Sequence, residues 1–252
     1  WEVNQYTITI NTVGGSDISP ITQNYNTAIT QPTDPTKLGH SFGGWYSDSS
    51  YTTTYSFPST MPATNVTVYA KWNVNSYTIS FEENGGSTVN NITQNYGTSL
   101  VMPSNPTLTG YEFKGWYLDK EFTEAYEFPS TMPAGNITLY AKWEIKQFTV
   151  SFEENGGSSV TDITLDYQAN ITRPSDPTKD GHTFAGWYLD PQFKFVYSFG
   201  QMPAENITVY AKWNVNSYMF TLVNDGIVTS NQVLAYGSTL NLPTLTKYGY
   251  EF

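Results

Sequence analysis

The sequence of 252 residues has no cysteine, only 11 basic residues against 22 acidic ones, and two histidines. The lack of cysteine excludes disulfides and thiolate chemistry, and it is compatible with a reducing cytoplasm as well as with a bacterial surface. The formal charge of −11 argues against binding of nucleic acid or of an anionic membrane through charge. No apolar run approaches the roughly 20 residues of a membrane-spanning helix, so we expect no membrane insertion in this segment.

A regular repeat is the main feature of the residues that are present. The triplet Gly-Trp-Tyr begins at Gly44, Gly115 and Gly186, at intervals of 71 residues, and each copy is followed by Met-Pro-Ala and then by Ala-Lys-Trp. A period this regular predicts an array of one small domain. We expect the end of a preceding repeat and a linker at residues 1–5, full repeats at 6–72, 77–143 and 148–213, and a partial fourth repeat at 218–252.

Both ends of the sequence fall inside a repeat. Trp1 occupies the position of the tryptophan in Ala-Lys-Trp, and Phe252 matches the phenylalanine that precedes Gly-Trp-Tyr in the full repeats. We therefore expect the sequence to be a window from a longer protein, with room outside it for secretion signals, anchors or a catalytic domain.

Each repeat begins with a run that is typical of a half-buried strand. In residues 77–81 of the second repeat, large apolar side chains alternate with Thr or Ser. The step Asn84-Gly85 follows, which is a strong hairpin signal, and a second strand-like run covers residues 92–96. The first two strands of each repeat are therefore predicted to form an antiparallel hairpin.

The second half of each repeat contains a proline-rich segment and a closing strand. Each repeat has two prolines in this segment, Pro103 and Pro106 in the second repeat. In the third repeat we expect residues 174–181 to make one helical turn, with Ser or Asp as the cap and Pro at the first position. The closing strand at 136–143 alternates, with its apolar residues on one face. The four-residue joint at 73–76 contains no Gly or Pro, so we predict a nearly continuous strand into the next repeat and a semi-rigid string of domains.

Few residues belong to the types that catalysis or metal binding needs. His40 and His182 share a repeat position that is Tyr111 in the second repeat, which favours packing, and neither has a second histidine at metal-ligand spacing. The pairs Glu82-Glu83 and Glu153-Glu154 are candidates for a calcium loop, a carboxylate pair or a charged hairpin tip. Their spacing departs from an EF-hand loop and the first repeat lacks them, which favours the tip.

Other surface features also have a structural alternative. Lys71, Lys142 and Lys212 are candidates for Lys–Asn isopeptide cross-links, but strand alternation directs them away from the apolar face. The aromatic residues include candidates for a glycan platform, although the area they bury favours a structural role for Trp116 and Trp143. The N-glycosylation pattern occurs at Asn65, Asn91, Asn136, Asn170 and Asn206, where strand alternation explains it equally well. We assign no catalytic, cofactor-binding or metal residue and predict no enzyme activity.

Together these motifs resemble a known family. The order Asn-Gly-Gly, Pro-x-x-Pro-Thr-x-x-Gly-Tyr/His-x-Phe-x-Gly-Trp-Tyr, Met-Pro-Ala and Thr-Leu-Tyr-Ala-Lys-Trp is similar to the Listeria–Bacteroides repeat over residues 6–213, and the similarity continues into 218–252. The resemblance implies an α+β, predominantly β class, with tandem small β-grasp-like domains arranged in line, each a mostly antiparallel sheet plus a short helix. It implies secreted or wall-anchored bacterial proteins, and it brings no catalytic residue and no cofactor.

The expected function is the repeat region of an extracellular or cell-surface bacterial protein that acts as a semi-rigid stalk or spacer in adhesion. One alternative is self-assembly into an extracellular fibre or sheath through unprotected edge strands. Another is a glycan-binding adhesin module that uses exposed aromatic side chains. The expected partners are accordingly a protein or glycan on a host or cell wall, or further copies of the chain, but not nucleic acid.

Overall fold

The structure, a computed structural model, describes residues 1–224, 226–242 and 248. Pro243, Gly249 and Phe252, which belong to the predicted fourth repeat, lie outside the described residues. By its internal contacts the chain divides into two units, Trp1–Leu108 with Phe113–Trp143 and Thr109–Glu112 with Glu144–Phe252.

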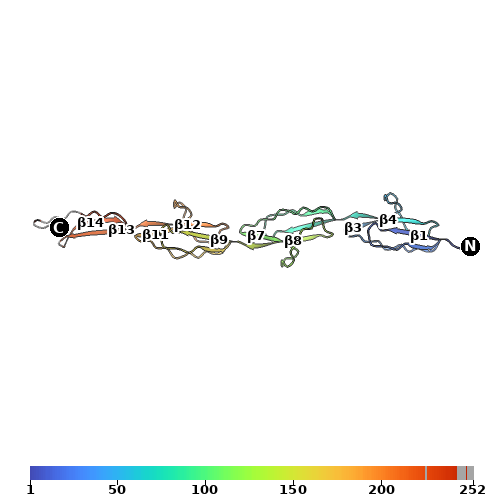
Figure 1. The fold of residues 1–252 in the computed structure, drawn as a ribbon, viewed down its shortest axis with the longest axis horizontal. Coiled ribbons are helices and arrows are strands. Elements are labelled where there is room, and N and C mark those ends of the chain that lie inside the picture. The colour runs from blue at the N-terminus through green and yellow to red at the C-terminus, as the bar shows by residue number, and fades with distance from the viewer. Residues whose placement is uncertain (225, 243–247, 249–252) are drawn as a thin grey trace. The chain divides into compact units, whose positions relative to one another are not determined.

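The described residues form strands and loops without any helix, as the arrows in Figure 1 show. The first repeat contains β1 (Gln5–Asn11), β2 (Ile21–Asn24), β3 (His40–Tyr46) and β4 (Val66–Val74). The second contains β5 (Ser76–Glu82), β6 (Ile92–Asn95), β7 (Tyr111–Tyr117) and β8 (Ile137–Ile145). The third contains β9 (Gln147–Glu153), β10 (Ile163–Asp166), β11 (His182–Tyr188) and β12 (Ile207–Val215). The fourth is a hairpin of β13 (Ser217–Asn224) and β14 (Ile227–Ala235).

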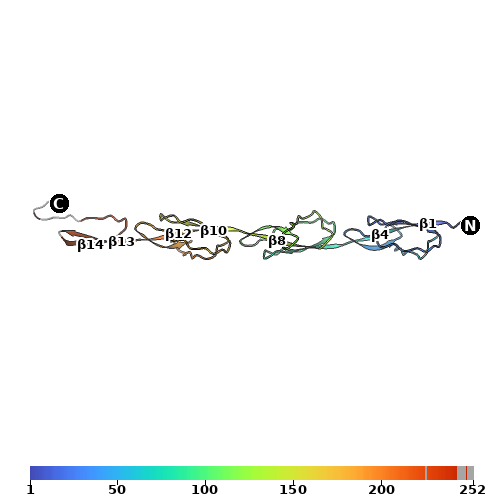
Figure 2. The same ribbon diagram turned by 90° about the horizontal axis from the view of Figure 1, so that it is seen from below.

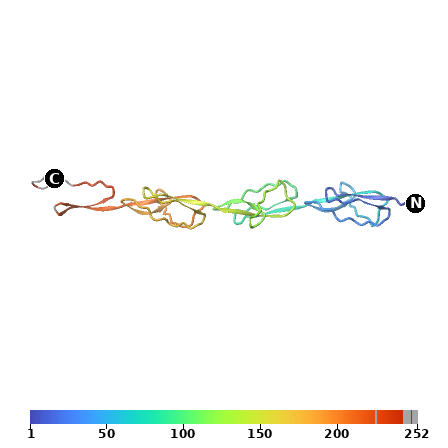
Figure 3. The same cartoon turned by 60° about the horizontal axis from the view of Figure 1, so that its bottom comes forward.

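The three full repeats have one sheet topology. The strand order is β2-β1-β4-β3 in the first repeat, and the corresponding strands follow the same order in the second and third. The first strand pairs antiparallel with the second, as predicted, and parallel with the closing strand. The three sets of strands can be followed by colour in Figure 3, from blue through green to orange.

The predicted α+β class, and with it the short helix of a β-grasp-like domain, is wrong, because the described part of the chain is all-β. Proline disfavours the α conformation of the residue before it, so Pro103 and Pro106 both oppose a helical turn. The backbone of this segment is hydrogen-bonded to a distant residue. The Thr107 carbonyl accepts a hydrogen bond from the Ser87 N–H, and the Thr107 N–H donates to the Ser87 hydroxyl. Distant bonds therefore replace the local bonds of a helix.

The Asn-Gly step forms the predicted tight turn, but this turn does not join two strands directly. The Gly86 N–H bonds to the Glu83 carbonyl at 3.0 Å, and Asn84 and Gly85 have φ angles of 50° and 94°. Two positive φ values at the central residues are the pattern of a type I′ turn. A further loop precedes β6, so the connection is longer than the hairpin signal predicted.

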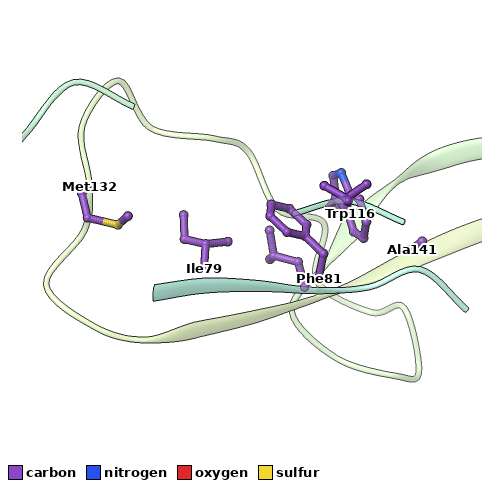
Figure 4. Close-up of a cluster of buried hydrophobic side chains, with 7 residues drawn as sticks. Ile79, Phe81, Trp116, Met132 and Ala141 are labelled. Atoms are coloured by element: carbon purple, nitrogen blue, oxygen red, sulfur yellow. The ribbon is translucent and has the colours of Figure 1, made fainter. Parts of the chain in front are cut away.

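Each full repeat has its own hydrophobic core of equivalent residues. Figure 4 shows the second core, in which Ile79 and Phe81 from β5 face Trp116 from β7 and Met132 from the long loop. Leu139 and Ala141 of β8 are also fully buried, while the alternating Tyr140 and Lys142 are not, as the strand period predicts. The methionine of Met-Pro-Ala thus anchors the long loop in the core.

Consecutive strands across a joint are separated by one residue. β4 ends at Val74 and β5 begins at Ser76, which leaves only Asn75 between them. Lys146 and Asn216 are the corresponding single residues in the next two joints. The prediction of a nearly continuous strand is confirmed by these bounds, whereas semi-rigidity stays a prediction.

The fourth repeat is an open hairpin over its described residues. β13 and β14 lie side by side in Figure 1 and in the turned view of Figure 2. Asn224 pairs with Ile227 at the end of the ladder, whereas a longer loop separates the first two strands of each full repeat. Met219 and Val233 are each 71% exposed, because no closing strand covers them in the part of the chain that the structure describes.

Candidate functional site

An aspartate organises the loop that follows Gly-Trp-Tyr in every full repeat. In the second repeat the Asp119 carboxylate accepts the N–H of Thr123 at 3.0 Å and that of Glu124 at 2.9 Å. These bonds, with that from Thr123 the strongest influence, lower the pKa of Asp119 below its ordinary value. Asp48 and Asp190 hold the equivalent loops in the same way.

The loop presses an aromatic ring against a lysine and a tyrosine of the sheet. The Lys142 ammonium lies 4.9 Å from the centre of the Tyr117 ring and 5.9 Å from that of Phe122. The two rings are edge to face at 5.7 Å, and Phe122 has a φ angle of 57°. We call these three residues the lysine–aromatic cluster. Its counterparts are Tyr46, Tyr51 and Lys71, and Tyr188, Phe193 and Lys212.

The lysine–aromatic cluster bears on whether the repeated lysines form isopeptide cross-links or pack against aromatic rings. Each of them makes cation–π contacts with rings. An isopeptide bond would instead need a buried lysine beside a carboxylate, so the geometry supports a structural role for Lys142 and its two counterparts.

In the second repeat, one glutamate of the pair and one asparagine of the glycosylation pattern make structural hydrogen bonds. Glu83 accepts the Val89 N–H at 2.6 Å and so fixes the loop before β6, while Glu82 is exposed. The Asn136 side chain accepts the Thr78 N–H at 2.9 Å. Across the described ranges, no group of three or more His, Cys, Asp or Glu side chains could hold a metal ion.

The two histidines lie at the joints, where they pack against a tyrosine of the next repeat. The His40 and Tyr96 rings meet edge to face at 5.9 Å, and His182 meets Tyr236 at 6.0 Å. Tyr111 makes the same contact with Tyr167 at 6.2 Å. The packing interpretation from the sequence is therefore supported by the contacts.

A cleft of about 630 Å³ opens at the first joint, lined in part by Trp72 and Lys37. The Trp72 indole N–H already bonds to the Thr12 carbonyl at 2.9 Å, and the Lys37 ammonium bonds to the Val13 carbonyl at 2.9 Å. These internal bonds occupy polar atoms that a sugar would otherwise use. The cleft therefore gives little support to a glycan site.

Sequence reasoning missed the partnership between the glycine of one repeat and the tyrosine of the next. Gly39 is buried beneath the ring of Tyr96, which directly follows β6 of the next repeat. Both residues recur with the repeat, so their spacing was visible in the sequence. Their contact was not, because it forms only when two repeats are folded next to each other.

The family model of the Listeria-Bacteroides repeat domain matches residues 6–71, 77–142 and 148–212. The chain belongs to the Listeria-Bacteroides repeat family. It is a tandem-repeat region of this family, and the resemblance noted from the sequence motifs is confirmed. This membership indicates the repeat region of a surface protein. The described residues contain no helix able to cross a membrane.

Similar proteins contain such repeats within longer chains. Two proteins of Evansella cellulosilytica, provisionally named as membrane proteins and one of them as Gly-rich, are each 40% identical to this chain over its whole length. Internalin H of Listeria monocytogenes serovar 1/2a is 38% identical over 56% of the chain. The chain spans 39% and 30% of the two Evansella proteins and 25% of Internalin H.

Proposed function

We propose that this Listeria-Bacteroides repeat chain is part of an extracellular, cell-surface bacterial protein and serves it as a semi-rigid stalk or spacer in adhesion. The observation that carries the proposal is the repetition of separate, equivalent cores joined by single residues. The predicted domain boundaries at 6–72, 77–143 and 148–213 are part of this proposal. A spacer needs such units and no shared reactive site.

The relatives support the same setting. Internalin H and the two Evansella proteins are longer than this chain, so the region that matches it is only part of each protein. The functional end of the protein would then lie in other parts of it. The repeats would set its distance from the cell, and the excess of acidic residues would keep neighbouring copies apart.

Small-angle X-ray scattering tests the proposal. A compact chain of this length would have a radius of gyration of about 18 Å, whereas units of roughly 30 Å placed in line would give roughly 30 Å. We expect the larger value, independent of concentration. A matched variant that lacks residues 77–147 removes one period in register and should shorten the particle by about one unit. A compact particle, or no shortening, would contradict the stalk.

The fibre alternative has a specific obstacle at the sheet edges. The edge strands β2, β6 and β10 have only four residues each, and the opposite edge strands β3 and β11 contain irregular pairing near their glycines. Short and bulged edges discourage pairing with another chain. A particle size that grows with concentration in the same scattering series would nevertheless favour the fibre.

The glycan alternative is tested by tryptophan fluorescence. Titration with host and cell-wall polysaccharides should give no saturable change if the aromatic residues are structural. A saturable change that disappears in a Trp72→Phe variant would instead identify a glycan site at the first joint.

A further inference from the structure

The turn that precedes the Gly-Trp-Tyr strand requires glycine for two independent reasons. The His40 N–H bonds to the Lys37 carbonyl at 3.1 Å, and Gly39 sits in this turn with a φ angle of 71°. A side chain at position 39 would also collide with the next repeat, because a Cβ there would lie 2.1 Å from the Cδ1 and Cγ atoms of Tyr96. The turn alone explains only the first requirement.

The joint residue connects the same two partners through the backbone. Asn75 donates its N–H to the Gly39 carbonyl at 2.9 Å and accepts the Tyr96 N–H at 2.9 Å. One residue is thus hydrogen-bonded to the repeat before it and to the repeat after it. The His40 ring also packs edge to face against the Tyr96 ring.

The arrangement recurs at every described joint. Lys146 donates to Gly110 and accepts from Tyr167, and Asn216 donates to Gly181 and accepts from Tyr236, all at 2.8–2.9 Å. A Cβ on Gly110 or Gly181 would lie 2.1 Å and 1.9 Å from the nearest ring atom of its tyrosine. The division of the chain by contacts agrees, since Thr109–Glu112 group with the residues that follow the joint.

The first repeat supplies an internal comparison. Tyr25 occupies the position of Tyr96 and makes the same backbone bond, to the Asn4 carbonyl at 2.9 Å. No glycine of the described residues packs on its ring, which is 51% exposed. The tyrosine is therefore placed by its own repeat and offers its ring to a neighbour.

We propose that this glycine–tyrosine contact is a latch that fixes consecutive repeats and couples their local stability. Each repeat presents a ring at one end and a bare glycine backbone at the other, so the surface on one repeat fits the next repeat of the same family. The latch deepens the proposed stalk function by supplying its stiffness. The short joint limits the motion of one repeat relative to the next, and the packed tyrosine ring restricts this motion further.

Spin labels measure the latch directly, because the chain has no native cysteine. Thr67→Cys and Thr138→Cys place labels at equivalent exposed positions of β4 and β8 in the full chain. With the latch intact, the distance distribution should be narrow. Gly39→Ala and Tyr96→Ala should each broaden it at least about twofold, whereas Tyr96→Phe should keep it narrow because the ring is retained.

Two matched variants separate the latch from general damage. Gly97 has a φ angle of 74° with nothing within 4 Å of the added Cβ, so Gly97→Ala carries the turn strain without the collision. Tyr25→Ala removes the equivalent ring without a glycine partner. Both should leave the distance distribution unchanged. A wild-type distribution as broad as that of Tyr96→Ala, or equal broadening by Gly97→Ala, would overturn the latch.

Amide hydrogen exchange gives a second readout in the same samples. The N–H groups of Asn75 and Tyr96 should exchange about two- to tenfold faster in Tyr96→Ala, the range expected from loss of an edge-to-face ring contact. The N–H of Val68, in the core strand of the first repeat, should not change. Unchanged exchange at Asn75 would contradict the coupling. Scattering tests the stalk separately: an extended particle with a broad label distribution would keep the spacer and reject the latch.

Discussion

At the scale of single residues, equivalent positions in the repeats show which side chain the fold prefers. Asn84 and Asn155 have φ angles of 50° and 52°, and each donates its side-chain amide to a carbonyl of the closing strand at 2.8 Å. Val13 holds the same turn position in the first repeat with a φ angle of 50°. A β-branched residue is disfavoured in this region and cannot make the amide bond.

We therefore predict that Val13→Asn stabilises the first repeat by about 1–2 kcal/mol, by relieving the backbone strain and adding a hydrogen bond. Amide exchange of core N–H groups such as that of Val68 would measure the change within this repeat. The reciprocal variant Asn84→Val should destabilise the second repeat by a similar amount. An unchanged or faster exchange in Val13→Asn would contradict the argument.

The loop aspartates predict a defined acid response. Backbone N–H bonds lower the pKa of Asp119 in the fold, while the unfolded chain keeps the ordinary value of about 3.9. The stabilisation is therefore present above about pH 3.9 and is lost as the pH falls through the lower pKa of the folded state. The protection factors of the Thr123 and Glu124 N–H groups, which correct for the intrinsic pH dependence of exchange, should fall over that acidic range.

Asp119→Asn tests this response, because it removes the titrating group from the loop. The variant should show a weaker dependence of local exchange on pH below about 4 than the wild-type chain. Glu205→Gln removes one negative charge outside this loop and serves as the control. Equal pH dependence in wild type and Asp119→Asn would show that other groups control the acid response.

At the scale of elements, the adjacent glutamates of the second repeat have unequal roles. Glu83 accepts the Val89 N–H, and Val89 is a buried residue of the loop before β6. Glu82 is exposed at the end of β5. The charged tip is therefore also the anchor of a loop.

We predict that Glu83→Ala destabilises the second repeat by about 1–2 kcal/mol, since it removes a hydrogen bond to a charged acceptor. Glu82→Ala, the neighbouring control, should change stability by less than about 0.5 kcal/mol. Denaturant unfolding combined with exchange of the Val89 N–H would measure both. Equal effects of the two substitutions would contradict the assignment of the anchor.

The two-proline segment shows why this element was mispredicted. In the third repeat its Ser, Asp and Pro residues satisfy the local rules for a helix start, yet Thr178 bonds to Ser158, 20 residues earlier. Proline disfavours the α conformation of the residue before it, and the distant partner pairs backbone groups that a helix would have paired. Local signals could not reveal that partner.

At the scale of the whole molecule, charge is the property that the sequence fixes directly. The formal charge of −11 separates copies at neutral pH and vanishes near the isoelectric point of about 4.4. We predict that light scattering rises reversibly near pH 4.4, because repulsion between copies is lost there. Added salt at pH 7 should produce a weaker increase by screening. Association that peaks at neutral pH instead would point to a specific assembly surface.

The sequence by itself determined the repeat period, the strands and the buried faces. Side chains alternate between the two faces of a strand, so Ile79 and Phe81, which are two residues apart, lie on the same face and share the core. This holds whichever strands pair with theirs. The motifs also determined family membership, because their order and spacing are intrinsic to the chain. These properties can be read from the order and spacing of residues along the chain.

The tertiary structure alone decided the contacts between residues far apart. It placed the closing strand parallel to the first strand, bonded Thr107 to Ser87, and laid Tyr96 on Gly39. The local sequence around each of these contacts is compatible with several backbone conformations. The folded arrangement selects the one in which the buried backbone groups find hydrogen-bond partners. That is why the strands could be predicted from the sequence and the latch could not.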